Sequence, residues 1–186
     1  MFDLRYIPRE NIFQKFFKAR ESLIQQFKKG DITKKEYIEE GYFEIQRLDI
    51  TPFKVVDSFE KAIFNYQYYN TMAKYYYLQA NQIKKYGKHM EKYKEFLKKV
   101  EDFYYKKDRS TMKAIEVLDY WGVEAYYIQV SSTYLKKKLY EIVFLDHKDV
   151  ILHSTCQWLL DRLKEEGIFK EGVRKSLIPN YVNQKY

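Results

Sequence analysis

Apolar residues recur every three or four positions along most of the first two thirds of the chain, a spacing that gathers them on one face of a helix. Glycine and proline fall mainly between these segments, where they begin or end helices. Asp108 or Ser110 supplies a side chain suited to capping the last segment. The pattern predicts five helices, over residues 8–29, 34–48, 57–86, 88–106 and 110–121.

After Gly122 the pattern becomes typical of strands. Residues 123–130 and 139–145 are dense in β-branched and aromatic side chains, and residues 150–153 form a third short run. Because the loops between them are short, the three runs predict an antiparallel meander. A sixth helix is predicted over residues 154–166.

Two capping boxes are predicted from residue spacing. Thr33 and Glu36 precede the second helix, and Ser154 and Gln157 open the sixth. In such a box, the hydroxyl accepts from the backbone N–H three residues on, and the longer side chain bonds back to the first residue. Ser154 is therefore expected to be a helix N-cap.

The predicted fold class is α+β: a mainly helical protein of about six helices, with a C-terminal three-stranded antiparallel sheet and a helix packed on it. The chain has 186 residues, enough for one domain or two small lobes. Residues 1–121 are predicted to form a helical lobe, and residues 122–186 a sheet-plus-helix lobe. No flexible linker separates the lobes, so they are expected to share one core.

Composition removes several functional classes. The six glycines are never closer than five residues apart, which excludes the Gly-rich loops that bind nucleotide phosphates. Cys156 is the sole cysteine, so an intrachain disulfide and a cysteine-based zinc site are excluded. The longest apolar run, Ile142–Leu145, is too short to span a bilayer, and the first residues lack the pattern of a secretory signal. We therefore expect a soluble cytoplasmic protein with no metal, cofactor or membrane segment.

The catalytic candidate is a pair at the start of the sixth helix, Cys156 and His153. A thiol in a helix's first turn meets the positive end of the helix dipole, which favours the reactive thiolate. His153 could act as the base, oriented by Asp161 or Asp146. The alternative is a buried core cysteine, because Cys156 also lies on the helix's apolar stripe. The sequence favours this alternative, so the enzyme hypothesis ranks last.

Positive charge is concentrated in one stretch. The whole chain has a net charge of +8, and residues 84–109 hold ten basic and five acidic side chains, a net 10 − 5 = +5. Such a stretch could bind nucleic acid or an acidic protein. The alternative is a solvated helix face, because many of its charges have the spacing of intrahelical ion pairs. The candidate partner-binding lysines are Lys92, Lys94, Lys98 and Lys99.

Tyrosine is also abundant, with 20 in the chain, although an AT-rich genome would account for much of the Lys and Tyr content. Tyr68 and Tyr75 lie seven residues apart, away from the main apolar face of the third helix. They could stack on bases or line a protein interface. The alternative, which the sequence favours, is that they pack at the rim of the core.

Three segments, residues 65–71, 139–144 and 157–160, together resemble a family of uncharacterised cytosolic proteins from clostridia-like, low-GC bacteria. The resemblance extends over essentially the whole chain. It implies no activity, cofactor or catalytic residue, because none is established for that family.

The sequence leaves three functional classes open. The first is a non-catalytic protein-interaction or regulatory module, favoured because the sequence lacks catalytic and cofactor motifs and is rich in aromatic residues. The second is a weak, non-specific nucleic-acid-binding protein. The third is an enzyme that uses Cys156 and His153. No substrate, specific partner or oligomeric state follows from the pattern.

Overall fold

The computed structural model describes residues 9–86, 89–120, 126–134, 137–144 and 150–165. The chain divides into two compact units, Met1–Ser110 and Thr111–Tyr186, which we describe separately. The boundary predicted between residues 121 and 122 lies outside the described residues.

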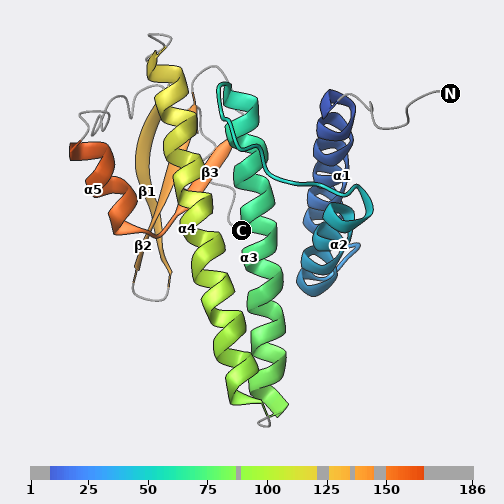
Figure 1. Cartoon of the computed structure of the whole chain (residues 1–186). Coiled ribbons are helices and arrows are strands. Elements are labelled where there is room, and N and C mark those ends of the chain that lie inside the picture. Colours follow the sequence, from blue (N-terminus) through green and yellow to red (C-terminus); the bar gives the residue numbers. More distant parts are fainter. Residues whose placement is uncertain (1–8, 87–88, 121–125, 135–136, 145–149, 166–186) are drawn as a thin grey trace, which may run out of the picture. The chain divides into compact units, whose positions relative to one another are not determined.

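The first unit is helical. It contains α1 (Arg9–Lys29), α2 (Lys34–Arg47), α3 (Phe59–Tyr86) and the first part of α4 (Met90–Tyr120). Helices α1 and α2 lie side by side, and α3 and α4 run antiparallel (Figure 1). No described helix combines the length and the apolar composition needed to cross a membrane.

The start and end signals of the first helices are confirmed. Gly30 has φ +79° just after α1, in the left-handed region that favours glycine. The capping box is present at α2, where Thr33 Oγ1 accepts from the Glu36 N–H at 3.2 Å. In return, the Thr33 N–H donates to the Glu36 carboxylate at 2.7 Å. These local contacts fix the α1–α2 hairpin.

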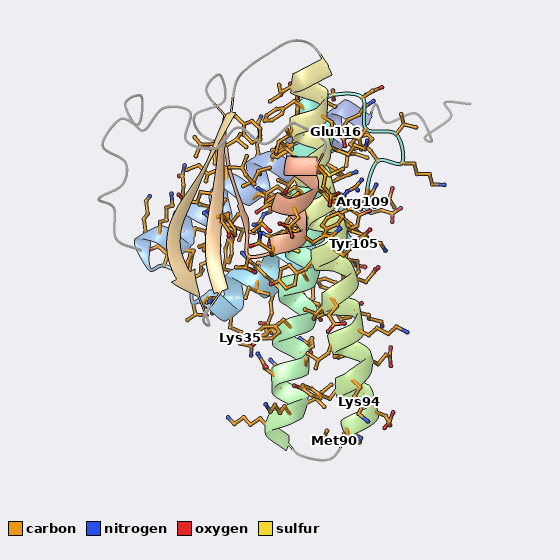
Figure 2. All side chains as sticks on the ribbon, turned by 90° about the vertical axis from the view of Figure 1, so that its left-hand side faces the viewer. Lys35, Met90, Lys94, Tyr105, Arg109 and Glu116 are labelled. Carbon is orange, nitrogen blue, oxygen red and sulfur yellow. The ribbon has the colours of Figure 1, made fainter. Side chains whose placement is uncertain are left out.

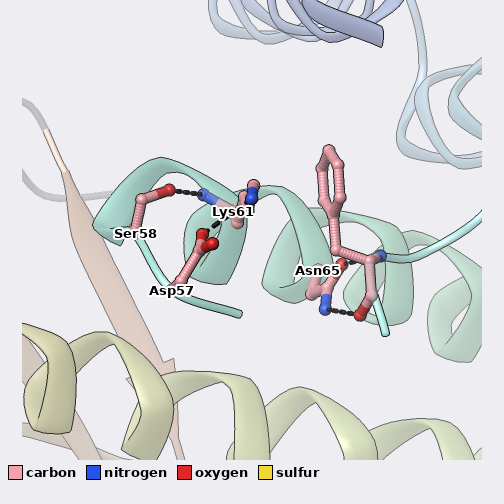
Figure 3. Close-up of polar contacts among 5 residues, drawn as sticks. Asp57, Ser58, Lys61 and Asn65 are labelled. Atoms are coloured by element: carbon pink, nitrogen blue, oxygen red, sulfur yellow. Dashed lines mark hydrogen bonds and ion pairs between the residues drawn. The ribbon is translucent and has the colours of Figure 1, made fainter. Parts of the chain in front are cut away.

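The start of α3 is held by a second set of local bonds (Figure 3). Ser58 Oγ accepts from the Lys61 N–H at 3.3 Å, and the Asp57 carboxylate pairs with Lys61 Nζ at 2.7 Å. One turn later, the buried Asn65 amide bonds to both the N–H and the carbonyl of Phe53, at 2.8 and 2.9 Å. Asn65 therefore attaches the segment before α3 to the helix itself.

Aromatic side chains dominate the core of the first unit. The Phe13 ring stacks on Phe64 with centroids 5.1 Å apart, and Phe16 meets Phe64 edge-on at 5.2 Å. Such pairs add directional contacts to the burial of apolar area. The fully packed cluster consists of Phe16, Ile45, Ile50, Phe64 and Met72.

The predicted break between a fourth and a fifth helix is wrong. Helix α4 continues through Asp108 and Ser110, so the described residues contain five helices instead of about six. Neither residue caps a helix, because both are buried within α4. Ser110 Oγ donates to the Lys106 carbonyl at 2.9 Å, so its hydroxyl is satisfied inside the continuous helix. No glycine or proline interrupts this stretch.

The second unit contains β1 (Tyr126–Tyr134), β2 (Lys137–Phe144), β3 (Ile151–Ser154) and α5 (Gln157–Glu165). The strands form one sheet in the order β1-β2-β3, and both pairs are antiparallel. The β1–β2 register shifts between Val130 and Ser132, at a bulge. With the helical first unit, this sheet confirms a broadly α+β, mainly helical protein.

The predicted N-cap role of Ser154 is wrong. Ser154 pairs with Tyr140 as the last residue of β3, and α5 begins only at Gln157. The buried Ser154 hydroxyl accepts from the Cys156 N–H at 3.0 Å, a local turn contact. The Gln157 amide donates to Asp161 at 2.9 Å and accepts from the Tyr140 hydroxyl at 3.2 Å, which ties α5 to β2.

Candidate functional site

Four side chains form an exposed line along α4, which we call the α4 stripe: Lys94, Lys98, Tyr105 and Arg109. At 100° per residue, the four positions fall within about 60° of the helix circumference and span about 22 Å. Figure 2 shows Lys94, Tyr105 and Arg109 at successive levels of α4. Tyr105 is 49% exposed, so the stripe combines three cations with an accessible aromatic side chain.

The three cations of the α4 stripe differ in their ion pairing. Lys94 Nζ lies 3.5 Å from the Glu91 carboxylate, a loose pair within one helical turn. By contrast, no residue in the described part of the chain forms an ion pair with Lys98 or Arg109. Both cations are exposed, so their charges are available to an acidic partner.

Helical geometry divides the four predicted lysines. Lys92 and Lys99 lie about 100–160° around α4 from Lys94 and Lys98. Lys99 Nζ bonds to the Glu95 carboxylate at 2.9 Å and lies 5.2 Å from the Tyr76 ring centroid. The hydrogen bond to Glu95 raises the pKa of Lys99. The four lysines therefore do not form one continuous surface.

Tyr68 and Tyr75 lie within the packing of the first unit. The Tyr75 ring stacks on Tyr42 of α2 with centroids 3.7 Å apart and planes 4° from parallel. Tyr68 packs against the apolar cluster and meets Tyr69 edge-on at 5.2 Å. Burial raises the pKa of both Tyr68 and Tyr75. These contacts support the core-rim alternative for both residues.

His153 and Cys156 lie at the β3–α5 junction, with different partners. His153 Nε2 is 3.2 Å from the carboxylate of Glu141, which is opposite it in β2. The His153 side chain is exposed on the sheet face opposite the buried Ser154, while Cys156 is partly exposed. Of the two acids predicted to orient His153, Asp161 accepts from Gln157 and Asp146 lies outside the described residues.

Sequence reasoning missed Glu141, Tyr105 and Arg109. Glu141 would follow from aligning the second and third predicted strands, since opposite residues in antiparallel strands lie side by side. Tyr105 and Arg109 extend the spacing that starts at Lys94 and Lys98, but the predicted helix break near residue 108 hid that continuity. Within the ranges that the structure describes, no three His, Cys, Asp or Glu side chains could hold a metal ion.

The profile of one protein family matches residues 6–186, nearly the whole chain. The protein belongs to the family of unknown function DUF6648. This match confirms the expected membership in an uncharacterised family. Comparisons with curated proteins and with solved structures found no match. Because DUF6648 has no assigned activity, the functional inference starts from the described side chains.

Proposed function

We propose that this DUF6648 protein is a non-catalytic interaction module that docks an acidic segment of a partner protein along the α4 stripe. The observation that carries the proposal is the alignment of Lys98 and Arg109, both exposed and without an ion-pair partner in the described residues, on the same face as Tyr105.

The chemistry of the stripe suits a mixed polar and apolar contact. The planar guanidinium of Arg109 can bind a carboxylate through two parallel hydrogen bonds, whereas Lys98 offers a compact charge. Tyr105 contributes a large, rigid contact surface between them. Exposed ion pairs are worth about 0.2–1 kcal/mol each, so binding is expected to be modest and to weaken as salt rises.

A protein partner fits the stripe better than nucleic acid does. Glu91 lies beside Lys94, and Glu101 and Asp102 are exposed in the same part of α4. These carboxylates would repel the continuous row of phosphates on a nucleic-acid strand. A protein segment can place its own carboxylates at the cations and neutral or basic side chains at the acids.

Anisotropy of a fluorescein-labelled peptide whose glutamates are separated by neutral residues tests the proposal, with random single- and double-stranded oligonucleotides as comparison ligands. The informative variant is Lys98→Glu, and the matched control is Lys92→Glu, the same charge reversal on another face of α4. We expect Lys98→Glu to weaken peptide binding at least fivefold at low salt, and Lys92→Glu less than twofold. If the two variants lose peptide affinity equally, docking along the α4 stripe is refuted. Oligonucleotide binding that is tighter than peptide binding and falls steeply with salt would favour the nucleic-acid alternative.

A photo-cross-linking residue in place of Tyr105 extends this test to cells. The proposal expects cross-linking to a protein through an acidic segment, and loss of that product when Arg109 becomes Glu. Cross-links to RNA, or to a protein segment whose capture the Arg109→Glu change leaves intact, would overturn it.

We also propose a cytoplasmic location in a low-GC bacterium. Support comes from the single Cys156, which suits a reducing compartment, and from a composition rich in residues with AT-rich codons. Cell fractionation with the native protein tests the location, and recovery in the secreted fraction would contradict it.

A further inference from the structure

Positive charge is buried in excess inside the first unit. Arg20 of α1 is 5% exposed, and Lys107 of α4 is 6% exposed. Lys74 of α3, which is half-buried, lies close enough to both to feel their charges. In the described part of this unit, the buried acidic residue is Asp108, which lies 3.1 Å from Lys107 Nζ. Asp108 therefore pairs with Lys107, whereas Arg20 and Lys74 have no carboxylate partner among the described residues, which leaves an excess of two positive charges.

The Arg20 guanidinium is held by contacts with Tyr37, but one of its N–H groups has no hydrogen-bond partner among the described residues. One terminal nitrogen donates to the Tyr37 hydroxyl at 2.6 Å, and the guanidinium carbon lies 5.0 Å from the Tyr37 ring centroid. The other terminal nitrogen lies 2.8 Å from where a Cβ on Gly41 would stand, so the guanidinium occupies space that only glycine leaves free. Arg20 Nε is buried and has no hydrogen-bond partner among the described residues.

Thr71 presents a second buried polar group beside the same glycine. Its methyl carbon lies 3.2 Å from the Gly41 Cβ position, and its Oγ1 is buried with no bond to any residue that the structure describes. Lys74 follows three residues later on α3, so its side chain lies on the same side of the helix as Thr71. Arg20 and Thr71 thus meet beside Gly41, and Lys74 lies one helical turn from Thr71, near enough to Arg20 to feel its charge.

Lys74 differs from Lys107 in its surroundings. Lys107 has Asp108 and the rings of Tyr66 and Tyr104, at 5.7 and 5.3 Å, to stabilise its charge. No ion pair to Lys74 is formed within the described ranges, and its charged neighbours are cations. Burial, together with the positive charges of Arg20, Lys107 and Lys34, lowers the pKa of Lys74 to about 8.

We propose that Arg20, Thr71 and Lys74 form an internal binding site for a phosphate group. Nε of Arg20, the Thr71 hydroxyl and the Lys74 ammonium are three hydrogen-bond donors, and phosphate oxygens are strong acceptors. A phosphate carries a charge of about −1.5 to −2 at pH 7, which matches the excess of two positive charges. A water molecule could satisfy Arg20 Nε and Thr71 Oγ1, but it would leave the repulsion at Lys74 uncompensated.

This site is independent of the α4 stripe. Its ligand could be inorganic phosphate or the phosphate of a small monoester, and the two sources share the same recognising atoms. Lys74 is partly exposed, whereas Arg20 and Thr71 are buried, so a ligand would reach them from the side of Lys74.

The test is titration of the full-length protein with inorganic phosphate, glycerol phosphate or sulfate, at ionic strength held constant with chloride. Calorimetry gives the Kd, and thermal unfolding gives the shift in Tm. Wild type is expected to show saturable phosphate binding and a rise in Tm that chloride does not produce. Tighter binding of glycerol phosphate than of inorganic phosphate would identify a monoester as the ligand.

Three variants locate the site. Lys74→Met is expected to weaken phosphate binding about tenfold or more, because it removes a charge-assisted hydrogen bond. Thr71→Val removes one neutral donor while keeping the side-chain shape, and is expected to weaken binding severalfold. The control Lys98→Met removes an exposed lysine and is expected to leave the Kd unchanged.

Two results would overturn the proposal. One is a wild-type Tm that responds to phosphate no more than to chloride. The other is a phosphate Kd that Lys74→Met and Thr71→Val leave unchanged. Since removal of an unfavourable buried charge does not unfold a protein, Lys74→Met keeps the test interpretable.

Discussion

Replacing Lys74 with methionine is expected to stabilise the protein. In the folded state, burial and the charges of Arg20, Lys107 and Lys34 lower the pKa of Lys74 from 10.5 to about 8. Each pKa unit corresponds to 1.36 kcal/mol, so a shift of about 2.5 units costs the folded state about 3 kcal/mol when Lys74 is charged. Methionine has a similar length and no charge, so Lys74→Met removes this cost.

The pH dependence follows from the direction of the shift. The folded-state pKa of Lys74 lies below its unfolded value, so the destabilisation is fully present below about pH 8. Between pH 8 and 10.5, the folded protein releases this proton while the unfolded chain keeps it, and the destabilisation fades. The advantage of Lys74→Met should therefore be large at pH 7 and small above pH 10.5.

Denaturant unfolding of wild type, Lys74→Met and Lys98→Met, in buffers free of phosphate and sulfate, provides the measurement. At pH 7 we expect Lys74→Met to raise the free energy of unfolding by about 1–3 kcal/mol, and the exposed control to change it by less than about 0.5 kcal/mol. Because the other groups titrate in the same way in variant and wild type, their contributions cancel in the difference between the two free energies of unfolding. A loss of stability at pH 7, or an equal gain at pH 7 and 10.5, would refute the assigned surroundings of Lys74.

Three further substitutions test local contacts, the first two by the change in the free energy of unfolding and the third by the Kd for phosphate. Asn65→Leu should cost about 2–3 kcal/mol, because it leaves both backbone groups of Phe53 without their hydrogen bonds; a cost below 1 kcal/mol would contradict those bonds. Thr33→Ala should cost about 1 kcal/mol through loss of the cap, and Thr33→Ser should restore most of it. Gly41→Ala should weaken phosphate binding, because its methyl group would displace the end of the Arg20 side chain; an unchanged Kd would count against the Arg20 contact.

The parts of the fold predicted from sequence are those fixed by neighbouring residues. Gly30 ends α1, and the Thr33–Glu36 box begins α2, within a few residues of each other. Such signals are visible in sequence because both partners belong to one turn of chain. Ser154 resembled them, but pairing with Tyr140 on another strand decided its role. The role of Ser154 could therefore not be predicted from its neighbours in the sequence, because it depends on pairing with a distant strand.

The candidate sites illustrate the same limit. Asp108 and Ser110 have the chemistry of cap residues, and only the unbroken backbone of α4 shows that the helix continues past them. Lys94 and Lys98 were predicted as binding residues, whereas Arg109, on the far side of the predicted break, was not. Arg20 could not be linked to Lys74 from sequence, because they come from helices that meet only through packing.

The cost of burying Lys74 and the proposed phosphate site make a joint prediction. A ligand that binds only the folded state stabilises it by about 2.7 kcal/mol at one hundred times its Kd, close to the cost assigned to Lys74. Because Lys74→Met is expected to bind phosphate about tenfold more weakly, saturating phosphate should stabilise wild type more than the variant by about 1.4 kcal/mol, and the gap at pH 7 should narrow by that amount. Chloride at equal ionic strength should leave most of the gap. If phosphate and chloride narrow the gap equally, general screening accounts for the effect, and Lys74 is an unfavourable charge without a ligand.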